Sequence, residues 1–298
     1  KKISYWFRTN ELSLHPSKTQ FVIFSKNDEN YNFHDINIVV NHNNENQNNE
    51  DLITKLSCVN INNDLPAIKF LGVYLDPKLN FKYHIDTIQS KISRSLYAIN
   101  TAKHLIDKTA LKTLYNSLIH SHLNYCIPIW GSAAKSHLNK LELQQKRAVR
   151  IISNSNYNAH TVPIFKLLNI LPISEQMKYS NLQIMYDYIN HKLPCSFDHI
   201  WQRNNQRADR LLRNARSFDI PYVRLQSFKN FPLSEFPRLW NEIIISNTNP
   251  NVLHNNIEID IYTFTEIMSK RQFSKKLKKL LLDKLTLLCR RDNCAECN

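Results

Sequence analysis

The stretch NYCIPIWGSAAKSHLNKLELQQKRAVRIIS, residues 124–153, joins a short apolar run to a basic helical segment. The apolar run reaches Trp130 and stops at Gly131, one of only two glycines in the chain. Residues 135–152 predict an amphipathic helix, because apolar residues recur at helical spacing. That apolar stripe consists of Leu138, Leu141, Ala148 and Ile152. The basic residues lie off the stripe: Lys140, Lys146, Arg147 and Arg150.

Further helices are predicted on both sides of this stretch. After Pro77, apolar residues recur every three or four positions and indicate an amphipathic helix: Ile85, Ile88, Ile92, Leu96, Ile99 and Ile106. Asp107 is suited to N-cap a second helix, whose stripe is Leu111, Leu114, Leu118 and His122. Residues 160–190 indicate a short helix, a Leu-Pro turn and a longer helix.

The N-terminal part indicates strands. Residues 1–12 resemble the end of a helix, and strand candidates follow at 19–25, 34–40, 52–61 and 67–76. Gly72 falls inside the last candidate, where a glycine often marks close approach by another backbone or a ligand. We therefore expect an α+β fold, mainly α, in which a small sheet precedes a helical body.

The chain is strongly basic. Its formal net charge is +14 over 298 residues, and its pI is about 9.5. Residues 78–150 carry 12 Lys and Arg against 3 acidic residues, and residues 270–291 carry 9 against 1. Such blocks favour a polyanion partner, nucleic acid before an anionic membrane surface. The alternative is that the blocks are ordinary solvated faces.

Composition excludes several classes of protein. Two glycines are too few for a G-x-G-x-x-G turn or a Walker A loop. No apolar run approaches the roughly 18 residues needed to cross a bilayer, so no membrane partner is expected. Six cysteines are too sparse for a disulfide scaffold and favour a reducing compartment, the nucleus or the cytoplasm. The start KKISYWFRTN lacks Met and an apolar signal region, which favours a fragment or a processed piece.

The last hundred residues contain three candidate features. Arg203, Arg207 and Arg210 share one side if their segment is helical. The segment FSKKLKKLLLDKLTLLC, residues 273–289, is a basic amphipath that suits nucleic acid, a membrane surface or a partner helix. The three cysteines of the C-terminal tail, Cys289, Cys294 and Cys297, have spacing suited to zinc. A fourth ligand is missing, and free thiols are the alternative.

Several segments together resemble a known family. KTQF (18–21), KFLGVYLDPKLNFKYHI (69–85), LIHSHLNYCIPIWG (118–131), LQQKRAVRIIS (143–153) and HTVPIFKLLNILP (160–172) occur in one order. They are similar to the C-terminal part of the reverse transcriptases of jockey-like non-LTR retrotransposons. FPRLWNEI (236–243) and FSKKLKKLLL (273–282) also resemble the tails of those proteins.

The resemblance implies three regions. Residues 1–77 correspond to the end of the palm with its small antiparallel sheet, residues 78–152 to a helical thumb, and residues 153–298 to a basic helical C-terminal region. Lys18 matches an auxiliary lysine that approaches the incoming triphosphate in such polymerases. His15 departs from the family, which commonly has Asn there. Residues 69–76 match the primer-grip hairpin, where Gly72 lets a nucleic-acid backbone pass close.

The resemblance also implies the binding residues. Ile127, Ile129 and Trp130 anchor the thumb core, and Gly131 turns the chain. Basic residues of all three regions are expected to face the phosphates of a template–primer hybrid of RNA and DNA. Such contacts do not read the nucleotide sequence. These residues are Lys69, Lys82, Lys91, Arg94, Lys140, Lys146, Arg147, Arg150, Arg203, Arg207 and Arg210, with Gly72 beside them.

The catalytic centre of such a polymerase is missing from the sequence. Paired aspartates hold two Mg²⁺ ions in the full-length family enzyme, and this chain contains no Asp-Asp pair. We therefore expect no bound Mg²⁺ and no polymerisation by this chain alone. The alternative function is a non-catalytic basic helical remnant that binds nucleic acid or a protein, and a less favoured one is a membrane-surface protein.

Overall fold

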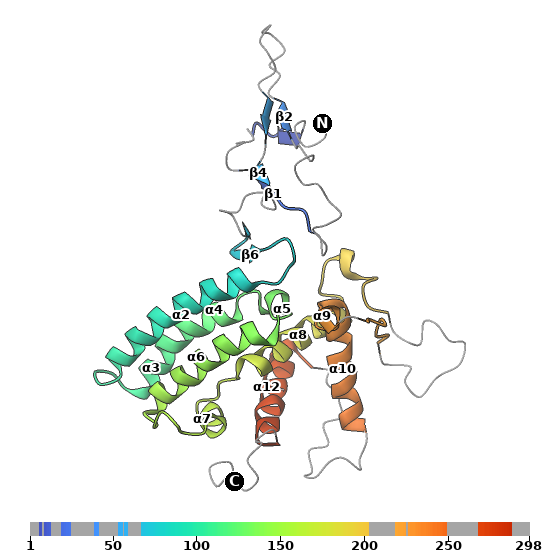
Figure 1. Ribbon diagram of the computed structural model, residues 1–298. Helices are drawn as coiled ribbons and strands as arrows, with labels where there is room; N and C mark the ends of the chain where they lie inside the picture. Colours follow the sequence, from blue (N-terminus) through green and yellow to red (C-terminus); the bar gives the residue numbers. More distant parts are fainter. Residues whose placement is uncertain are drawn as a thin grey trace. The chain divides into compact units, whose positions relative to one another are not determined.

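The computed structural model describes residues 6–7, 9–12, 19–24, 39–41, 53–55, 57–58, 67–202, 218–224, 226–248 and 268–287. The chain divides into two compact units, Lys1–Asp86 and Thr87–Asn298. The predicted fold class is confirmed, because short strand pairs precede a series of helices along the chain (Figure 1). The fold is α+β and mainly α.

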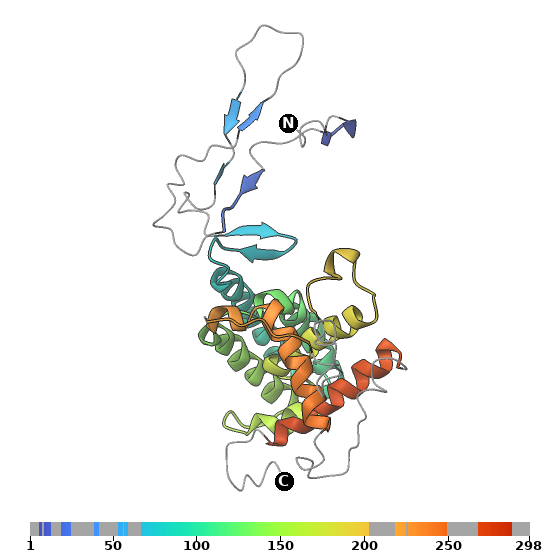
Figure 2. The same cartoon turned by 90° about the vertical axis from the view of Figure 1, so that its right-hand side faces the viewer.

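The strands of the first unit form three separate pairs. β1 (Gln20–Phe21) pairs in parallel with β4 (Ser57–Cys58). β2 (Val39–Asn41) pairs antiparallel with β3 (Ile53–Lys55). The third pair is an antiparallel hairpin, drawn as two adjacent arrows in Figure 2. It consists of β5 (Ile68–Phe70) and β6 (Val73–Leu75).

The hairpin corrects the expectation of one strand over 67–76. Phe70 pairs with Val73, so Leu71 and Gly72 form a two-residue turn. Both turn residues have positive φ, 44° for Leu71 and 88° for Gly72. This is the pattern of a type I′ turn, whose twist matches that of the strands it joins. Gly72 therefore lies in the turn and not, as the residue pattern alone predicted, inside a strand. The hairpin itself agrees with the family resemblance, which implied one over 69–76.

Asp76 links the hairpin to the first long helix. Its carboxylate accepts hydrogen bonds from the backbone N–H groups of Lys78 (3.1 Å), Asn80 (2.9 Å) and Phe81 (2.7 Å). These bonds satisfy donors just ahead of helix α2 (Lys82–Ala102). The predicted apolar stripe of α2 is confirmed for five buried residues: Ile85, Ile88, Ile92, Leu96 and Ile99. Its sixth member, Ile106, lies beyond the end of the helix and is half-buried, so that part of the prediction is wrong.

The second unit is helical in the part of the chain that the structure describes (Figure 1). After α2 come α3 (Lys108–Tyr115), η4 (Asn116–His120), α4 (Ser121–Asn124), α5 (Ile127–Trp130), α6 (Lys135–Ser153), α7 (Thr161–Leu167) and α8 (Ile173–Ile189). They are followed by η5 (Cys195–Phe197), α9 (Gln226–Lys229), α10 (Pro232–Thr248) and α12 (Lys270–Leu287). The N-cap of α3 is Asp107, as predicted, and its side chain accepts from the N–H of Ala110 at 3.1 Å.

A π-helical turn corrects the stripe predicted for the second helix. η4 is a π-helix in which the N–H of Ser121 bonds to the carbonyl of Asn116. The buried residues therefore follow a four-residue step: Leu111, Tyr115, Ile119 and Leu123. Leu118, predicted to be buried, is 37% exposed. The 3.6-residue period fails here because the wider turn shifts which side chains face the core.

The corner at 126–131 is tightly packed. Ile127 and Trp130 are fully buried, and the Trp130 indole N–H donates to the Tyr125 carbonyl at 2.7 Å. A Cβ built on Gly131 would lie 2.5 Å from the Ile127 carbonyl oxygen, so close packing requires glycine there. Ile129 is 48% exposed, and its predicted place in the core is wrong. A four-residue helix has room to bury only one of its faces.

Helix α8 lies at the centre of the second unit. It contacts α5 and α6 on one part of its surface and α10 and α12 on another. Around α10 and α12 it forms a cluster of buried apolar and aromatic residues: Leu182, Met185, Tyr186, Trp201, Phe218, Phe236, Leu239, Trp240, Phe273, Leu277 and Leu281. This cluster fixes the helical C-terminal region, whose fold the sequence pattern left open.

Candidate nucleic-acid interface

Helices α2 and α6 are held together by a buried glutamine. The Gln144 side-chain amide donates to the carbonyl of Gln89 (3.2 Å) and to the hydroxyl of Ser93 (2.6 Å). The side of α2 that carries Gln89 and Ser93 therefore faces α6. The opposite edge of the helix faces η4, since the Ser95 hydroxyl donates to the Leu118 carbonyl at 3.1 Å.

A second buried glutamine joins α6 to α3 and α8. The Gln145 amide donates to the Tyr115 hydroxyl and to the Leu171 carbonyl, both at 2.9 Å. Its carbonyl accepts from the N–H of Ile173 at 2.8 Å. Burial raises the pKa of Tyr115 to about 12, despite the hydrogen bond from Gln145, so this hydroxyl stays neutral. The scaffold beneath α6 is thus held by directional bonds as well as by apolar packing.

The cations of α6 lie in different environments. Lys146 forms an ion pair with Glu142 at 2.6 Å. The Arg150 guanidinium donates through Nε to the Ala159 carbonyl (3.0 Å) and lies over the Tyr157 ring, 6.0 Å from its centroid. Lys140 is half-buried, while Arg147 is exposed. All four lie off the buried stripe, and Arg147 is the most accessible of them to a phosphate.

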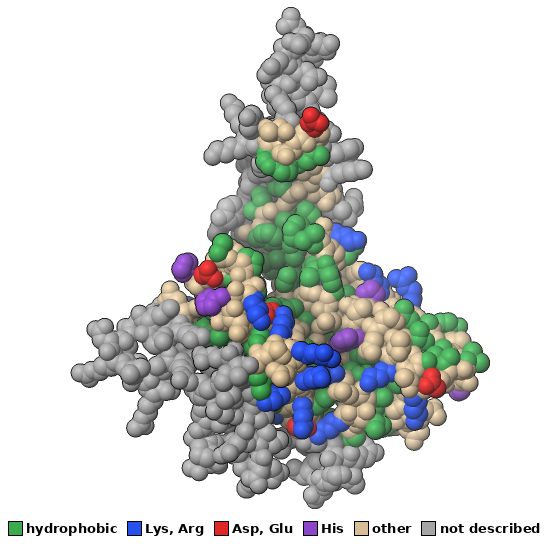
Figure 3. All heavy atoms as spheres, turned by 180° about the vertical axis from the view of Figure 1, so that it is seen from behind, with side chains coloured by type: hydrophobic (Ala, Val, Ile, Leu, Met, Phe, Trp, Pro, Cys, Tyr) green, Lys and Arg blue, Asp and Glu red, His purple; other side chains and the backbone are tan. Residues whose placement is uncertain are grey.

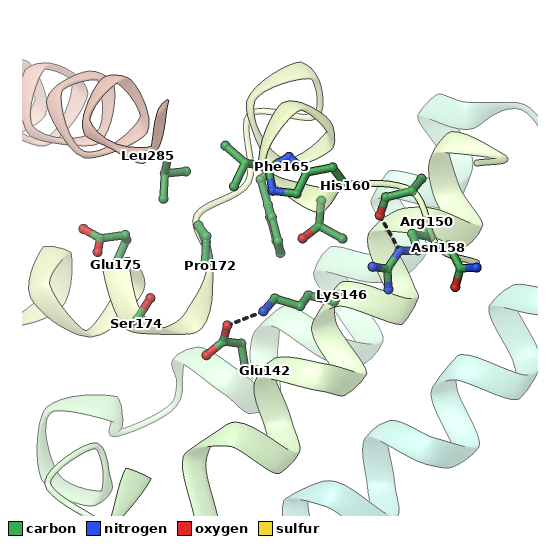
Figure 4. Close-up of a pocket in the computed structure, with 13 residues that line it drawn as sticks. Glu142, Lys146, Arg150, Asn158, His160, Phe165, Pro172, Ser174, Glu175 and Leu285 are labelled. Atoms are coloured by element: carbon green, nitrogen blue, oxygen red, sulfur yellow. Dashed lines mark hydrogen bonds and ion pairs between the residues drawn. The ribbon is translucent and has the colours of Figure 1, made fainter. Parts of the chain in front are cut away.

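Lys146 and Arg150 also line a pocket of about 350 Å³ (Figure 4). Its walls combine these cations with His160, and with the apolar side chains of Phe165 and Pro172. The dashed lines in Figure 4 mark the Lys146–Glu142 pair and the Arg150–Ala159 bond. Because both cations are already engaged within the fold, the pocket has less positive charge to offer than the sequence indicates.

The cations of α2 are exposed but do not form one row with those of α6. Lys91 lies near His122 of α4, whose pKa is lowered by burial and then by the charge of Lys91. Arg94 is exposed farther along α2. Lys82, also exposed, belongs to the first unit. The predicted thumb cations are thus distributed around the helices, and their binding of phosphate stays a prediction.

The hairpin presents its tip to solvent. Phe70 and Leu71 are 61% and 76% exposed. The Lys69 ammonium lies over the Tyr74 ring, 5.9 Å from its centroid. Gly72, in the turn, leaves the backbone beside these residues uncovered by a side chain of its own. This arrangement is compatible with the predicted contact to a nucleic-acid backbone, which no observation tests.

Several predicted residues fall outside the described part of the chain. They are Lys18, Arg203, Arg207, Arg210, Cys289, Cys294 and Cys297. Among the described residues, no group of three His, Cys, Asp or Glu side chains could hold a metal ion. None of the helices that the structure describes has the length and apolar character needed to span a bilayer.

One group of residues was missed from the sequence. The charge of Lys278 on α12 lowers the pKa of His120 on η4, and the charge of Lys112 on α3 lowers the pKa of Lys278, in each case after burial. The signal available was the basic block at 270–291, but α12 is far from α3 along the chain. Only the packing of α12 on the helical body lets these charges act on one another.

Known proteins similar to this chain share one described activity. This chain is 31% identical over 116 residues to "RNA-directed DNA polymerase from mobile element jockey" of Drosophila melanogaster. The match covers 38% of this chain and 13% of that protein. The chain is 22% identical over 151 residues to "Probable RNA-directed DNA polymerase from transposon X-element" of the same organism, covering 50% and 15%. The corresponding protein from transposon BS is 28% identical over 112 residues, covering 37% and 12%.

The chain thus matches only a small part of the length of these relatives. No family model matches it, and no solved structure matches it. The names of these relatives agree with the family that the ordered motifs of the sequence resemble. Over the matched 37–50% of its length, the chain is therefore related to the jockey-like RNA-directed DNA polymerases of non-LTR retrotransposons.

Proposed function

We propose that this chain comprises the end of the palm, the thumb and the C-terminal region of a reverse transcriptase, and that it holds a template–primer hybrid of RNA and DNA. The similarity to RNA-directed DNA polymerases supports the proposal most directly. The exposed cations Arg94 and Arg147 support it physically, because neither has an ion-pair partner among the described residues. Phosphate contacts of this kind position a duplex without reading its sequence.

The proposed role is to hold nucleic acid rather than to catalyse. Polymerases of this class use Mg²⁺ held by carboxylates to stabilise the charge that develops on the phosphates. The described residues do not provide a set of ligands for such an ion, and the sequence has no Asp-Asp pair. The chain's contribution is then to position the hybrid, with Lys18 as an auxiliary cation near the incoming triphosphate. A nuclear or cytoplasmic location follows from this role.

The alternative function is a basic helical module that binds nucleic acid or protein without serving polymerisation. The pairing of Lys146 with Glu142 and the bond from Arg150 to the Ala159 carbonyl favour it, because these two cations of α6 are already used within the fold. The two functions differ in whether the cations of α2 and α6 matter more than other surface cations. General attraction to a polyanion depends on net charge, whereas a thumb uses particular side chains.

The test compares two double variants that remove the same charge. Arg94→Ala/Arg147→Ala removes the proposed contacts, and Arg224→Ala/Lys229→Ala removes two exposed cations elsewhere. Fluorescence anisotropy of a labelled RNA–DNA hybrid is measured between 50 and 200 mM salt. Each lost phosphate contact reduces the slope of log affinity against log salt concentration by about 0.9. The slope of the first variant is therefore expected to be smaller by nearly 2. Equal losses in both variants would contradict the proposed site and favour the alternative function.

A further inference from the structure

The pocket beside helix α6 lies wholly within the second unit and is built from four helices. Its lining comes from α6, from α7 and the loop ahead of it, from the start of α8 and from Leu285 of α12. Its volume of about 350 Å³ is within the range of about 300–1,000 Å³ that is typical of small-ligand sites. A pocket of this size admits a small molecule or a single unit of a polymer, but not a duplex.

Most of the charge in the pocket is balanced within the fold. The two carboxylates that line it, Glu142 and Glu175, each form an ion pair with a lysine, at 2.6 and 2.8 Å respectively. Arg150 is engaged only in part, because its Nε donates to an uncharged group, the Ala159 carbonyl. Among the described residues, the guanidinium has no acidic partner. The uncompensated charge of the pocket is therefore one guanidinium, which favours a ligand with an anionic group.

Two contacts hold the Arg150 side chain in place. The Nε–H donates to the Ala159 carbonyl at 3.0 Å, and the guanidinium lies over the Tyr157 ring, 6.0 Å from its centroid. A guanidinium has five N–H donors in one plane, so four remain on the two terminal nitrogens. Such a pair of nitrogens matches two oxygens of a phosphate. Because the group is already oriented, less conformational entropy is lost when an anion binds.

The pocket changes in character from one end to the other. Figure 4 shows Arg150 and Asn158 at one end, Pro172 and Leu285 toward the other, and Phe165 between them. The last three side chains are buried and give the pocket an apolar wall. A ligand with an anionic head and a flat, mostly apolar body suits this arrangement, with its head at Arg150 and its body along the wall.

The loop next to Arg150 adds a stacking surface and hydrogen-bonding groups. Tyr157 is 75% exposed, although Arg150 lies over its ring. Asn156 and Asn158 on either side of it are exposed, and an amide both donates and accepts hydrogen bonds. Sites for single-stranded nucleic acid combine exposed aromatic rings, on which bases stack, with cations that meet the phosphates. The loop therefore favours a nucleotide over an aliphatic acid as the ligand.

We propose that this pocket binds a nucleoside monophosphate, whether as a free nucleotide or as an unpaired nucleotide of a single strand. The phosphate lies against the terminal nitrogens of Arg150, and the nucleoside enters the pocket toward Phe165. In a strand, the neighbouring base stacks on Tyr157. The identity of the ligand rests on the proposed nucleic-acid binding, but this site takes one unpaired nucleotide, whereas the surface of Arg94 and Arg147 holds a duplex.

The first test uses ligands that carry a single phosphate. Figure 3 shows Lys and Arg side chains gathered on one face of the helical unit, and such a face attracts any polyanion. Binding of AMP, adenosine and inorganic phosphate to the full chain is therefore compared by calorimetry. AMP is expected to bind at least tenfold more tightly than adenosine or inorganic phosphate, because both ends of the pocket are used. Equal affinity for inorganic phosphate would show that no nucleoside enters and would overturn the inference.

A single-stranded decamer distinguishes the two sources of the nucleotide. If the site belongs to a strand, the decamer binds more tightly than AMP, and Tyr157→Ala weakens decamer binding at least fivefold, because a stacked base is lost. If the site takes a free nucleotide, AMP binds as tightly as the decamer and Tyr157→Ala leaves AMP binding unchanged. Either result supports the pocket, and absence of binding by both ligands would overturn it.

A blocking variant locates the site. Ser174 is exposed, lines the pocket and is the second residue of α8. Ser174→Trp is expected to weaken AMP binding at least tenfold and to change binding of a blunt RNA–DNA hybrid less than twofold. Ser136→Trp, at the exposed second position of α6 and outside the pocket, is the matched control. Unchanged AMP binding in Ser174→Trp, or an equal loss in Ser136→Trp, would overturn the inference.

A second variant decides the question if Ser174→Trp lowers the melting temperature. Arg150→Lys keeps the charge but removes the paired donors, and is expected to weaken AMP binding about tenfold. Arg224→Lys, at an exposed position far along the chain, is the control and should leave AMP binding unchanged. AMP binding that is the same in Arg150→Lys as in the unaltered chain would contradict the proposed phosphate position.

The two proposals can fail separately. If Arg94→Ala/Arg147→Ala weakens hybrid binding while Ser174→Trp leaves AMP binding unchanged, only the pocket is removed. If Ser174→Trp abolishes AMP binding in a chain that binds no hybrid, the pocket stands as a nucleotide site and the proposed function falls.

Discussion

Helices α6 and α12 are similar in length, charge and hydrophobic pattern, but their cations lie in different environments. Both are basic and amphipathic, with 19 and 18 residues. On α6, Lys146 is paired with Glu142, and Arg150 is bonded to the Ala159 carbonyl. On α12, burial and then the charge of Lys112 lower the pKa of Lys278. An amphipathic pattern therefore predicts which side chains lie outside the core. Whether a cation among them is neutralised or can bind an anion depends on the neighbouring elements.

The buried faces of the two helices differ as well. α6 buries Gln144 and Gln145 among apolar residues, and both side chains donate hydrogen bonds to other elements. α12 buries Phe273, Leu277 and Leu281 against an apolar cluster. Directional bonds from its buried face fix one orientation of α6, whereas the buried face of α12 is apolar and its polar bonds lie near its N-terminal end. Two substitutions test this difference, and the one with the larger expected effect comes first.

Gln145→Leu is expected to destabilise the protein by about 4 kcal/mol. It leaves the Leu171 carbonyl and the Ile173 N–H without their buried partner, and each unpaired group costs about 1–3 kcal/mol. Urea denaturation followed by circular dichroism measures the free energy of unfolding. Asn139→Ala, on the exposed face of α6, is the control and should change stability by less than about 0.5 kcal/mol. A loss below about 1 kcal/mol for Gln145→Leu would show that α6 does not depend on these bonds.

Leu281→Ala is expected to cost about 3 kcal/mol, because it leaves a cavity in the cluster beneath α12. The same denaturation experiment applies. Lys279→Ala, at an exposed position of the same helix, serves as the matched control. If both variants are equally stable, α12 does not dock on the body as described.

The smallest effect concerns pH. His120 and His122 have lowered pKa values, caused first by burial and then by Lys278 and Lys91 respectively. The unfolded chain therefore binds more protons than the folded protein between the lowered pKa values and 6.5, so stability rises with pH through that window. The free energy of unfolding should fall as pH is lowered from 7.5 to 5.5. His120→Gln/His122→Gln should flatten this dependence, and His104→Gln, at an exposed position, should leave it intact.

Much of the helical body was predictable from local pattern. The α2 stripe, the Asp107 cap, the span of α6 and the core positions of Ile127 and Trp130 agree with the structure. The errors arose where local geometry departs from a regular period. The predicted burial of Leu118 was wrong because of the π-helical turn, and the predicted strand position of Gly72 was wrong because of a turn with two positive φ angles. Neither departure has a strong signature in hydrophobic spacing.

The amino-acid sequence by itself determined the fold class, the basic character and the resemblance to reverse transcriptases, because periodicity, charge and ordered motifs are properties of the chain. Only the tertiary structure decided that Lys146 pairs with Glu142 and that α12 packs against α7 and α8. The physical reason is that charges and apolar contacts act over distances in space rather than along the sequence. The packing of α12 brings it against helices that lie far from it along the chain.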